Sequence, residues 1–467
     1  MKGIGIDFGT SNSAIAVFDG SQLQMIEIEP GARTVPTAIH LDRDYQTLTG
    51  SVAIKSYVEE NADRRVEITA KVIAEVDVEM EDGEGENLKI YGAGEDHGLP
   101  GRLFLGIKRL LGKQNIIRLM VFDRPFRLVA LITPILLSFR NAINAAIGRV
   151  DVAKHGIYMG RPVEFEGDGA GKNSLATDRI QESSGYAQLG QVNFYPEPVA
   201  ACLSFVTNQN IDNGSTVLTV DFGGGTLDLC LVNYQGDQSF QVLGTEGVAI
   251  GGDYVDQLIF EKLIFPELGK GLQWTRTVDG STITTPFPFD EYESALLNWT
   301  ITHTLNQNQF TGKIAQYLDQ HKAKNDGATS PEVEKLQRLE DVIHHNYSYN
   351  IFQHIKAAKI ALSDVESTEL DIPELNLTLP LTRQQLNDII AEVIESLQNC
   401  IDQLLANTNT DPSTINFVMR TGGSSHIAAV VELLESLFPG KVVQHDTFTS
   451  VASGLAIASY YGYECKV

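Results

Sequence analysis

The chain has 467 residues, of which 60 are acidic and 35 are Lys or Arg, so its formal net charge is −25 at pH 7. A surface of this charge repels phosphate backbones and anionic lipids, which argues against a nucleic-acid or membrane partner. The length exceeds that of one hydrophobic core, so two lobes are expected; the four scattered cysteines argue against a disulfide framework or a zinc site and for a reducing, cytoplasmic location.

The first 40 residues predict strands of an antiparallel meander, with no signal peptide ahead of them. A short apolar strand ends in Asp7-Phe8-Gly9, and a hydroxyl-rich turn, Thr10-Ser11-Asn12, leads into an alternating strand. Such a turn lets backbone N–H groups converge on an anion, and a carboxylate at a strand end can hold a hydrated divalent ion.

A helix is predicted over 50–72. The strongly acidic segment 75–96 is interpreted as a solvated excursion, with a surface for a basic partner as the alternative. Lys108 follows, flanked by apolar residues before a glycine, where its ammonium can point into a cleft, although most lysines are simply solvated. A helix over 124–147 contains the most apolar window, 128–137, which is too short to span a bilayer and is expected to be buried.

The next predicted strand begins at residue 157 and ends in glycine and Pro162. A helix near 176–188 and a short run over 192–195 lead to Glu197, which lies between two prolines at the start of an alanine-rich helix. This position gives the glutamate a defined direction. The alternative is an ordinary first-turn charge that complements the helix dipole.

A second glycine turn follows the strand that ends in Asp221-Phe222. Three glycines, Gly223 to Gly225, remove the Cβ atoms that would keep a ligand from the backbone, and Thr226 adds a hydroxyl donor. Alone, this turn reads as a simple hairpin. Because it repeats the plan around Asp7, the sequence predicts two similar halves, each presenting a phosphate loop and a carboxylate to a nucleotide between them.

The remaining chain continues the alternation of strands and helices. Gly251-Gly252 precede a helix whose N-terminus can face phosphate. The segment 265–350 is mixed. Further predicted elements are strands near 274–285, a polar helix over 312–345, a helix over 351–362, strands over 370–381, a helix over 383–406 begun by Thr382, a strand–glycine turn–helix unit over 417–426 and a closing helix over 450–461.

These units, in this order, resemble the nucleotide-binding domain of the seventy-kilodalton heat-shock chaperone family, within the actin and sugar-kinase superfamily. The resemblance spans nearly the whole chain. It implies an α/β, actin-like ATPase fold with two lobes, each built on a ribonuclease-H-like mixed five-stranded sheet: lobe I over 1–213, completed by 447–467, and lobe II over 214–446. The chain stops about where that domain should end, so no β-sandwich for substrate peptides is expected, as in stand-alone chaperone-like proteins of bacteria.

The same resemblance assigns the site residues. Catalytic roles fall on Lys108, Glu197, Asp221 and Thr226, water-mediated magnesium binding on Asp7 and Asp221, and a switch role on Pro162. Nucleotide contacts fall on Asp7, Gly9, Thr10, Ser11, Asn12, Gly223, Gly224, Gly225, Gly251, Gly252, Lys359, Ser363, Gly422, Gly423, Ser424 and His426. Two positions depart from the family: Lys356 replaces a glutamate, and His426 replaces the arginine that commonly stacks on adenine.

The resemblance implies an ATP-binding, chaperone-like protein with ATP or ADP and Mg²⁺ as cofactors, in which slow hydrolysis drives lobe closure. A protein client or co-chaperone and a monomeric state are expected. Three alternatives stay open. They are a sugar-kinase-like phosphotransferase with Asp228 as the obvious base, an actin-like filament or scaffold protein, which self-repulsion disfavours, and an ATP-binding protein without turnover.

Overall fold

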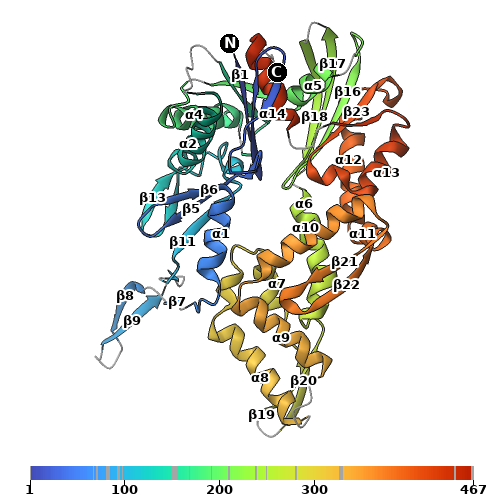
Figure 1. The fold of residues 1–467 in the computed structure, drawn as a ribbon. Helices are drawn as coiled ribbons and strands as arrows, with labels where there is room; N and C mark the ends of the chain where they lie inside the picture. Colours follow the sequence, from blue (N-terminus) through green and yellow to red (C-terminus); the bar gives the residue numbers. More distant parts are fainter. Residues whose placement is uncertain are drawn as a thin grey trace.

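The computed structural model describes residues 2–66, 68–69, 72–79, 85–91, 95–96, 98–148, 156–162, 164–167, 169–190, 192–208, 211–236, 239–248, 250–278, 281–324, 330–445 and 449–463. Two mixed sheets form the upper half of the molecule as drawn in Figure 1, and helical segments with small hairpins form the lower half.

The first mixed sheet contains the strand that carries Asp7. Its strand order is β15-β14-β1-β2-β3, and β4 also pairs with β2. The pairs β1–β2 and β2–β3 are antiparallel, whereas β1–β14 and β14–β15 are parallel. The strands are β1 (Gly3–Phe8), β2 (Asn12–Phe18), β3 (Leu23–Met25), β4 (Thr34–Pro36), β14 (Ile157–Arg161) and β15 (Asn193–Pro196).

The second mixed sheet repeats this plan around Asp221. Its order is β18-β17-β16-β23-β24, with two antiparallel pairs on one side and two parallel pairs on the other. The strands are β16 (Thr216–Phe222), β17 (Leu227–Gly236), β18 (Ser239–Val248), β23 (Phe417–Thr421) and β24 (Val442–Gln444). β1 and β16 therefore hold the same central place, and the repeat predicted from the two Asp-Phe-Gly turns is confirmed.

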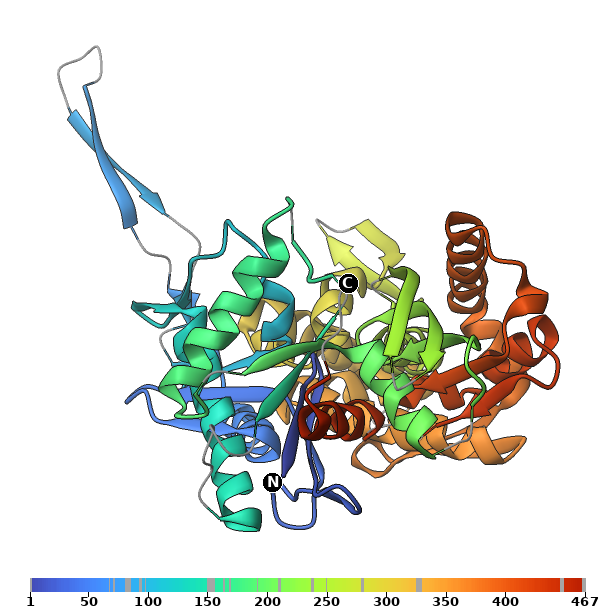
Figure 2. The same ribbon diagram turned by 90° about the horizontal axis from the view of Figure 1, so that it is seen from above.

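Helices α5 (Glu197–Asn208) and α14 (Ser450–Tyr461) join the two sheets through a shared apolar cluster. They approach closely because residue 454 of α14 is glycine: a Cβ there would lie 1.7 Å from the carbonyl oxygen of Ala200 in α5. Gly5 of β1 likewise lets β1 approach α14, since a Cβ on Gly5 would lie 2.2 Å from the carbonyl oxygen of Ala452. Figures 1 and 2 show α14 beside β1, so the last described helix packs against the first strand.

The first sheet has further elements on its outer side. Phe139 and Leu136 of one covering helix lie in the core beneath β1. A hairpin of β8 and β9 projects away from the body in both views. The elements are β5 (Ala38–Asp42), β6 (Thr47–Thr49), α1 (Gly50–Asn61), β7 (Ile68–Thr69), β8 (Val72–Glu79), β9 (Gly85–Tyr91), β10 (Glu95–Asp96), β11 (Gly101–Leu105), β12 (Arg118–Val121), β13 (Arg124–Arg127), α2 (Leu128–Ile147) and α4 (Lys172–Tyr186).

The second sheet rests on a larger apolar core that includes Trp274, Tyr292 and Tyr317. Below it, helices and two hairpins extend toward the bottom of Figure 1. The elements are α6 (Gly252–Ile259), β19 (Gln273–Val278), β20 (Ser281–Pro286), α7 (Asp290–Leu296), α8 (Asn308–Lys324), α9 (Pro331–His344), α10 (Ser348–Asp364), β21 (Ser367–Ile372), β22 (Leu377–Thr382), α11 (Arg383–Ile389), α12 (Ala391–Thr408) and α13 (Ala428–Leu437).

Several predicted boundaries were wrong. The helix predicted over 50–72 ends at Asn61, and the one predicted over 124–147 begins at Leu128 because 124–127 pairs as β13. The excursion at 75–96 contains a hairpin, while its acidic side chains up to residue 95 lie outside the described residues. Thr382 does cap its helix, in a capping box with Gln385, but that helix is divided at Ile390.

Helix α2 is the one helix in the described part of the chain that is long and apolar enough to cross a membrane, judged by length and composition. The length objection raised for its apolar window therefore does not hold for the whole helix. Nine of its residues are buried, and Leu131, Ile135 and Phe139 lie in the core of the first sheet. A core helix passes the same test, so the observation is weak evidence for a membrane span.

Candidate functional site

A cavity of about 220 Å³ lies where the two Asp-Phe-Gly turns face each other. The first turn and the second turn both line it, the latter through Gly223, Gly224, Gly225 and Thr226. A Cβ on Gly224 would lie 2.9 Å from the Ser11 hydroxyl oxygen, so the two turns nearly touch across the cavity. The strand repeat thus brings together two loops that are far apart in the sequence.

Acidic side chains from both sheets meet at this cavity. Asp7 comes from the end of β1, Asp221 from the end of β16, and Glu197 from the start of α5. Lys108 reaches them from a 3-10 turn, is only 5 % exposed, and its ammonium donates to the Glu197 carboxylate. A Cβ on Gly160 would lie 2.9 Å from Cγ of Glu197, so a glycine on β14 makes room for this glutamate.

Three aspartates of the cavity, Asp7, Asp221 and Asp228, hold their protons more tightly than usual. Removal from bulk water, followed by repulsion from neighbouring carboxylates, raises the pKa of Asp7 to about 7 and that of Asp221 to about 8, against the attraction of Lys108. Desolvation in the cleft also raises the pKa of Asp228. The two cations that line the cavity, Lys108 and Arg109, are outnumbered by its acidic side chains, and a divalent cation would supply further positive charge.

The second turn has two polar features besides its glycines. Thr226 donates its hydroxyl to the Asp228 carboxylate at 2.6 Å. A Cβ on Gly225 would lie 2.1 Å from a guanidinium nitrogen of Arg109, which covers the turn and lies 3.4 Å from a carboxylate oxygen of Glu166. Only glycine leaves the backbone of this turn within reach of that guanidinium.

The residues assigned to the adenosine side divide into two groups. Gly422 and Gly423 line the cavity, and a Cβ on Gly422, which has φ of +81°, would lie 2.6 Å from the Asp221 carboxylate. Ser424 lies next to them and donates its hydroxyl to the Gly223 carbonyl at 3.2 Å. The described residues that line the cavity do not include the other six of this set: Gly251, Gly252, Lys359, Ser363, Ser424 and His426.

Gly251 and Gly252 pack behind the second turn. The Gly252 N–H donates to the Gly223 carbonyl at 2.9 Å, and a Cβ on Gly251 would lie 2.2 Å from the Gly224 carbonyl oxygen. Lys359 of α10 donates to the Gly252 carbonyl at 3.2 Å and pairs with Asp256 at 2.5 Å, both side chains being largely buried. These residues hold the second turn in place.

The two positions that depart from the family also have definite surroundings. Lys356 pairs with Asp253 of α6 at 3.7 Å, so its charge is directed to a helix start. Partial burial, with repulsion from Arg420, lowers the pKa of His426, which favours its neutral form at neutral pH. Ser363 is not among the described residues that line the cavity, and its carbonyl accepts from Arg383 at 3.1 Å.

Sequence reasoning missed some residues of the cavity. Thr34, Arg109, Glu166, Thr421 and Ser450 line it and had no assigned role. The signal for Arg109 was its place beside Lys108. Thr34 and Ser450 lie far from both turns in the sequence, and only the folding of the whole chain brings them to the cavity, so no local pattern predicts their place.

The strand order and the facing turns define a class: a mixed α/β protein consistent with the actin-like ATPase fold. A family model described as "Hsp70 protein" matches residues 3–80, 178–271 and 320–460, more than half of the chain. The chain therefore belongs to the Hsp70 family. Lys108 and Pro162 lie between the matched segments, whereas Asp7, Glu197 and Asp221 lie within them.

Curated relatives agree with this membership. The chain is 22% identical to a chaperone protein dnaK of Thalassiosira pseudonana over 466 aligned residues, which cover 97% of this chain and 62% of the relative. A chaperone protein dnaK of Trieres chinensis is also 22% identical, covering 97% of this chain and 60% of the relative. The chain thus spans about three fifths of the length of the curated relatives it matches.

Proposed function

We propose that this protein is an ATP-binding, chaperone-like protein whose slow, Mg²⁺-dependent hydrolysis of ATP opens and closes two lobes. Lobe I would comprise 1–213 with 447–467, lobe II would comprise 214–446, and each would rest on one of the mixed sheets as a ribonuclease-H-like unit. The observation that carries the proposal is the pair of Asp-Phe-Gly turns facing each other across a cavity lined by carboxylates and Lys108. Family membership supports it.

The cavity residues fit the phosphates of a nucleotide with Mg²⁺. The glycines remove the Cβ atoms that would keep an anion from the backbone of the second turn, where the Gly223 N–H donates to the Thr226 carbonyl at 3.0 Å. Asp7 and Asp221 are oxygen ligands that could hold the water shell of the metal. When bound, Mg²⁺ would neutralise charge on the phosphates. The cations Lys108 and Arg109 would attract the same phosphates.

The protein side chains would divide the work by charge. Lys108 would place its ammonium against the terminal phosphate, and Glu197, which now accepts from it, would orient a water molecule. Thr226 and the N–H groups of both turns would stabilise the charge that grows on the transferred group. Such catalysis rests on positioning and electrostatics, which suits the slow turnover of a switch.

A whole nucleotide needs more room than the cavity provides. Its volume of about 220 Å³ lies below the roughly 300–1,000 Å³ of ordinary ligand sites. Gly252, Lys359 and Ser424 are packed on the second turn and do not line the cavity, so exposing an adenosine site beside them would require a wider cleft. We therefore infer that binding accompanies a hinge motion, in which Pro162 at the end of β14 serves as the switch.

One observation favours a second candidate, an ATP-binding protein without turnover. The ammonium of Lys108 is already bound by Glu197, and in that state neither group is free to act on phosphate or water. In either case we expect a cytoplasmic monomer with a protein client or co-chaperone as partner.

Calorimetry with Mg²⁺ and ATP, followed by single-turnover hydrolysis, tests the proposal. The parent protein is compared with Lys108→Ala and with Lys313→Ala, which removes a lysine paired with Glu291 outside the cavity. Binding with slow hydrolysis that only Lys108→Ala abolishes would support the ATPase. Binding without hydrolysis in the parent would assign the second candidate, and no binding at all would overturn both.

A further inference from the structure

Two arms of the molecule meet far from the nucleotide cavity. The first arm is residues 50–66, which contain α1, and the second arm is residues 290–349, which contain α7 to α9. Figure 1 shows α1 beside this second arm at the centre of the molecule. We call their contact the arm junction.

Backbone and side-chain hydrogen bonds hold the arm junction. The Asp63 N–H donates to the His344 carbonyl at 3.0 Å, and the Val66 N–H donates to the Asn306 carbonyl at 3.0 Å. The Asn306 side chain donates in return to the Arg64 carbonyl at 3.0 Å. Trp299 and Tyr349 also pack on the small apolar cluster under α1.

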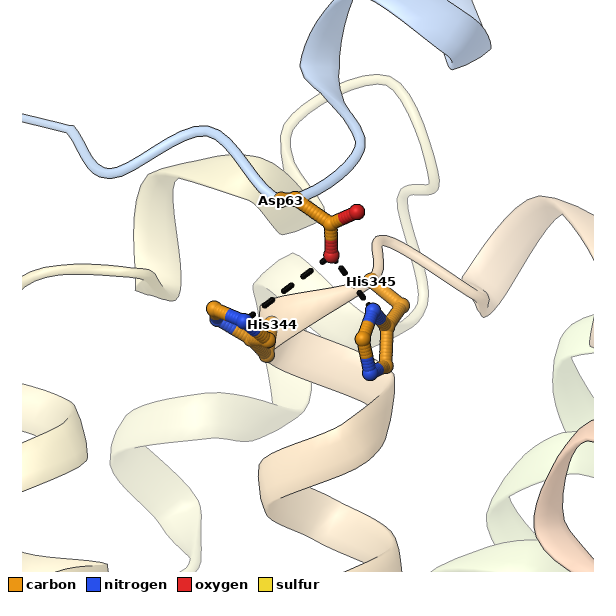
Figure 3. Close-up of side chains that lie close together, drawn as sticks. All are labelled: Asp63, His344 and His345. Atoms are coloured by element: carbon orange, nitrogen blue, oxygen red, sulfur yellow. Dashed lines mark hydrogen bonds and ion pairs between the residues drawn. The ribbon is translucent and has the colours of Figure 1, made fainter.

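Three side chains that can bind a metal converge at this junction. Asp63 follows α1, whereas His344 and His345 end α9, and one ligand atom from each lies within 4.8 Å of the others. Figure 3 shows both imidazole rings directed at the Asp63 carboxylate. The same Asp63 oxygen lies 2.5 Å from Nδ1 of His345 and 3.9 Å from Nε2 of His344.

These spacings suit a tetrahedral transition metal. Zinc bonds to imidazole nitrogen and carboxylate oxygen are about 2.0–2.2 Å long, which places neighbouring ligand atoms roughly 3.4 Å apart. The two Asp63–histidine distances lie on either side of that value, and no pair of ligand atoms is more than 4.8 Å apart, so shifts of roughly 1–1.5 Å would bring all three to zinc spacing. Three protein ligands would leave the fourth position to water.

The backbone holds Asp63 beside His344 before any metal binds, while both side chains are exposed to solvent. Asp63 has φ of +56° and Asn346 has φ of +57°, so both lie in the left-handed region, where aspartate and asparagine are tolerated. The hydrogen bond from the Asp63 N–H to His344 locks the two segments together. The carbonyl end of α9 also carries partial negative charge, which favours a cation there.

The arm junction differs from the ordinary histidine–carboxylate pairs of this chain. His354 pairs with Glu374 at 2.9 Å, and His40 pairs with Glu60 at 2.9 Å, in each case as one histidine with one carboxylate. Asp63 instead faces two rings from one helix end. Within the described residues it is the only cluster of three histidine, cysteine or acidic side chains with metal-binding spacing. A hydrogen bond to His345 alone does not account for the direction of His344.

We propose that Asp63, His344 and His345 form a zinc site that fastens the two arms together. The scattered cysteines argued against a zinc site, but this one uses none. Imidazole nitrogen is a common zinc ligand, and a carboxylate completes a set that also suits other first-row metals. The proposal does not depend on nucleotide binding.

Zinc titration of the full chain tests the site, with excess Mg²⁺ to occupy the acidic cavity and a chromophoric chelator as competitor. The parent should bind one more equivalent of zinc than Asp63→Asn or His344→Gln, which should each weaken that site at least about 10-fold. His354→Gln, a change of the same type in an ordinary pair, should bind like the parent. Asparagine keeps the left-handed backbone of residue 63, so loss of folding is not expected.

His344→Gln is the decisive variant because it leaves the Asp63–His345 hydrogen bond intact. If that bond alone explains the cluster, His344→Gln binds zinc like the parent, and the proposal is overturned. Failure of the parent to bind the extra equivalent overturns it as well. As a second readout, Co²⁺ should give the visible absorption of a tetrahedral site in the parent and lose it in His344→Gln.

Hydrogen exchange tests the fastening. Zinc should slow exchange of the Asp63 and Val66 amides, which donate across the junction, in the parent and not in His344→Gln. Zinc binding without this protection would overturn the role as a fastener. Zinc binding in a protein that fails to bind ATP would leave this site standing while the proposed function fell.

Discussion

The crossing of α5 and α14 makes a quantitative prediction about the fold. Gly454→Ala places a Cβ 1.7 Å from the carbonyl oxygen and 2.5 Å from the carbonyl carbon of Ala200. These are backbone atoms inside a helix and cannot turn aside as a side chain does. Extra atoms in a packed core cost about 1–3 kcal/mol and occasionally more, so we expect a loss of about 3 kcal/mol or more.

The matched control is another helical glycine, Gly185 of α4. An added Cβ there meets no atom within 4 Å. Because alanine favours a helix over glycine, Gly185→Ala should stabilise the protein by about 0.5–1 kcal/mol. The same chemical change should therefore shift stability in opposite directions at the two positions.

Urea unfolding followed by circular dichroism measures both effects. The midpoint should fall for Gly454→Ala and rise for Gly185→Ala. Because α14 also packs on β1, the first variant should lose stability in the segment that carries Asp7. A midpoint of Gly454→Ala equal to that of the parent would refute the close approach of the two helices and the packing derived from it.

Three further predictions concern charge. The pKa of Asp221 in the folded protein, about 8, exceeds its ordinary value of 3.8. The free energy of unfolding of the metal-free protein should therefore fall as pH rises from about 4 to 8, because the unfolded chain gives up this proton more readily. Mg²⁺ should reverse this loss, and Asp221→Asn should flatten the plot of melting temperature against pH. Arg109→Ala should weaken ATP binding in calorimetry about 10-fold or more, since a charge-assisted bond contributes about 1.5–3 kcal/mol, while exposed Arg127→Ala should not. Lys359→Met leaves the buried Asp256 carboxylate unpaired and should cost about 3–5 kcal/mol in urea unfolding, with recovery when Asp256→Asn is added.

The repeat of strand, Asp-Phe-Gly and turn was enough to predict the centre of the fold. Asp7 and Asp221 end the central strands of two sheets with the same strand order, and the turns after them face one cavity. Such motifs are local, because glycine and the alternation of apolar residues fix the turn and the strand without help from elsewhere.

What the sequence could not provide depends on contacts between distant segments. The resemblance named Lys359 and Ser424 as nucleotide contacts, but whether they line the cavity depends on how α10 and β23 pack behind the second turn. The partnership of Asp63 with His344 joins residues 281 positions apart, and a local pattern contains no sign of it. The end of α1 at Asn61 was not predicted, because no proline or glycine follows it to mark the end of a helix.

The zinc site and the nucleotide cavity would be coupled through the hinge. The arms touch through a few hydrogen bonds and a small apolar cluster, whereas α5 and α14 join the sheets through an extensive core, so the arm junction is the weaker of the two connections. Opening the cavity to admit adenosine would break the weaker one. Zinc, by fastening the arms, should then weaken ATP binding, and since coupling between two binding sites is reciprocal, bound ATP should weaken zinc binding by the same factor. A variant such as His344→Gln should lose both effects while leaving the cavity residues untouched, which separates this coupling from damage to the nucleotide site.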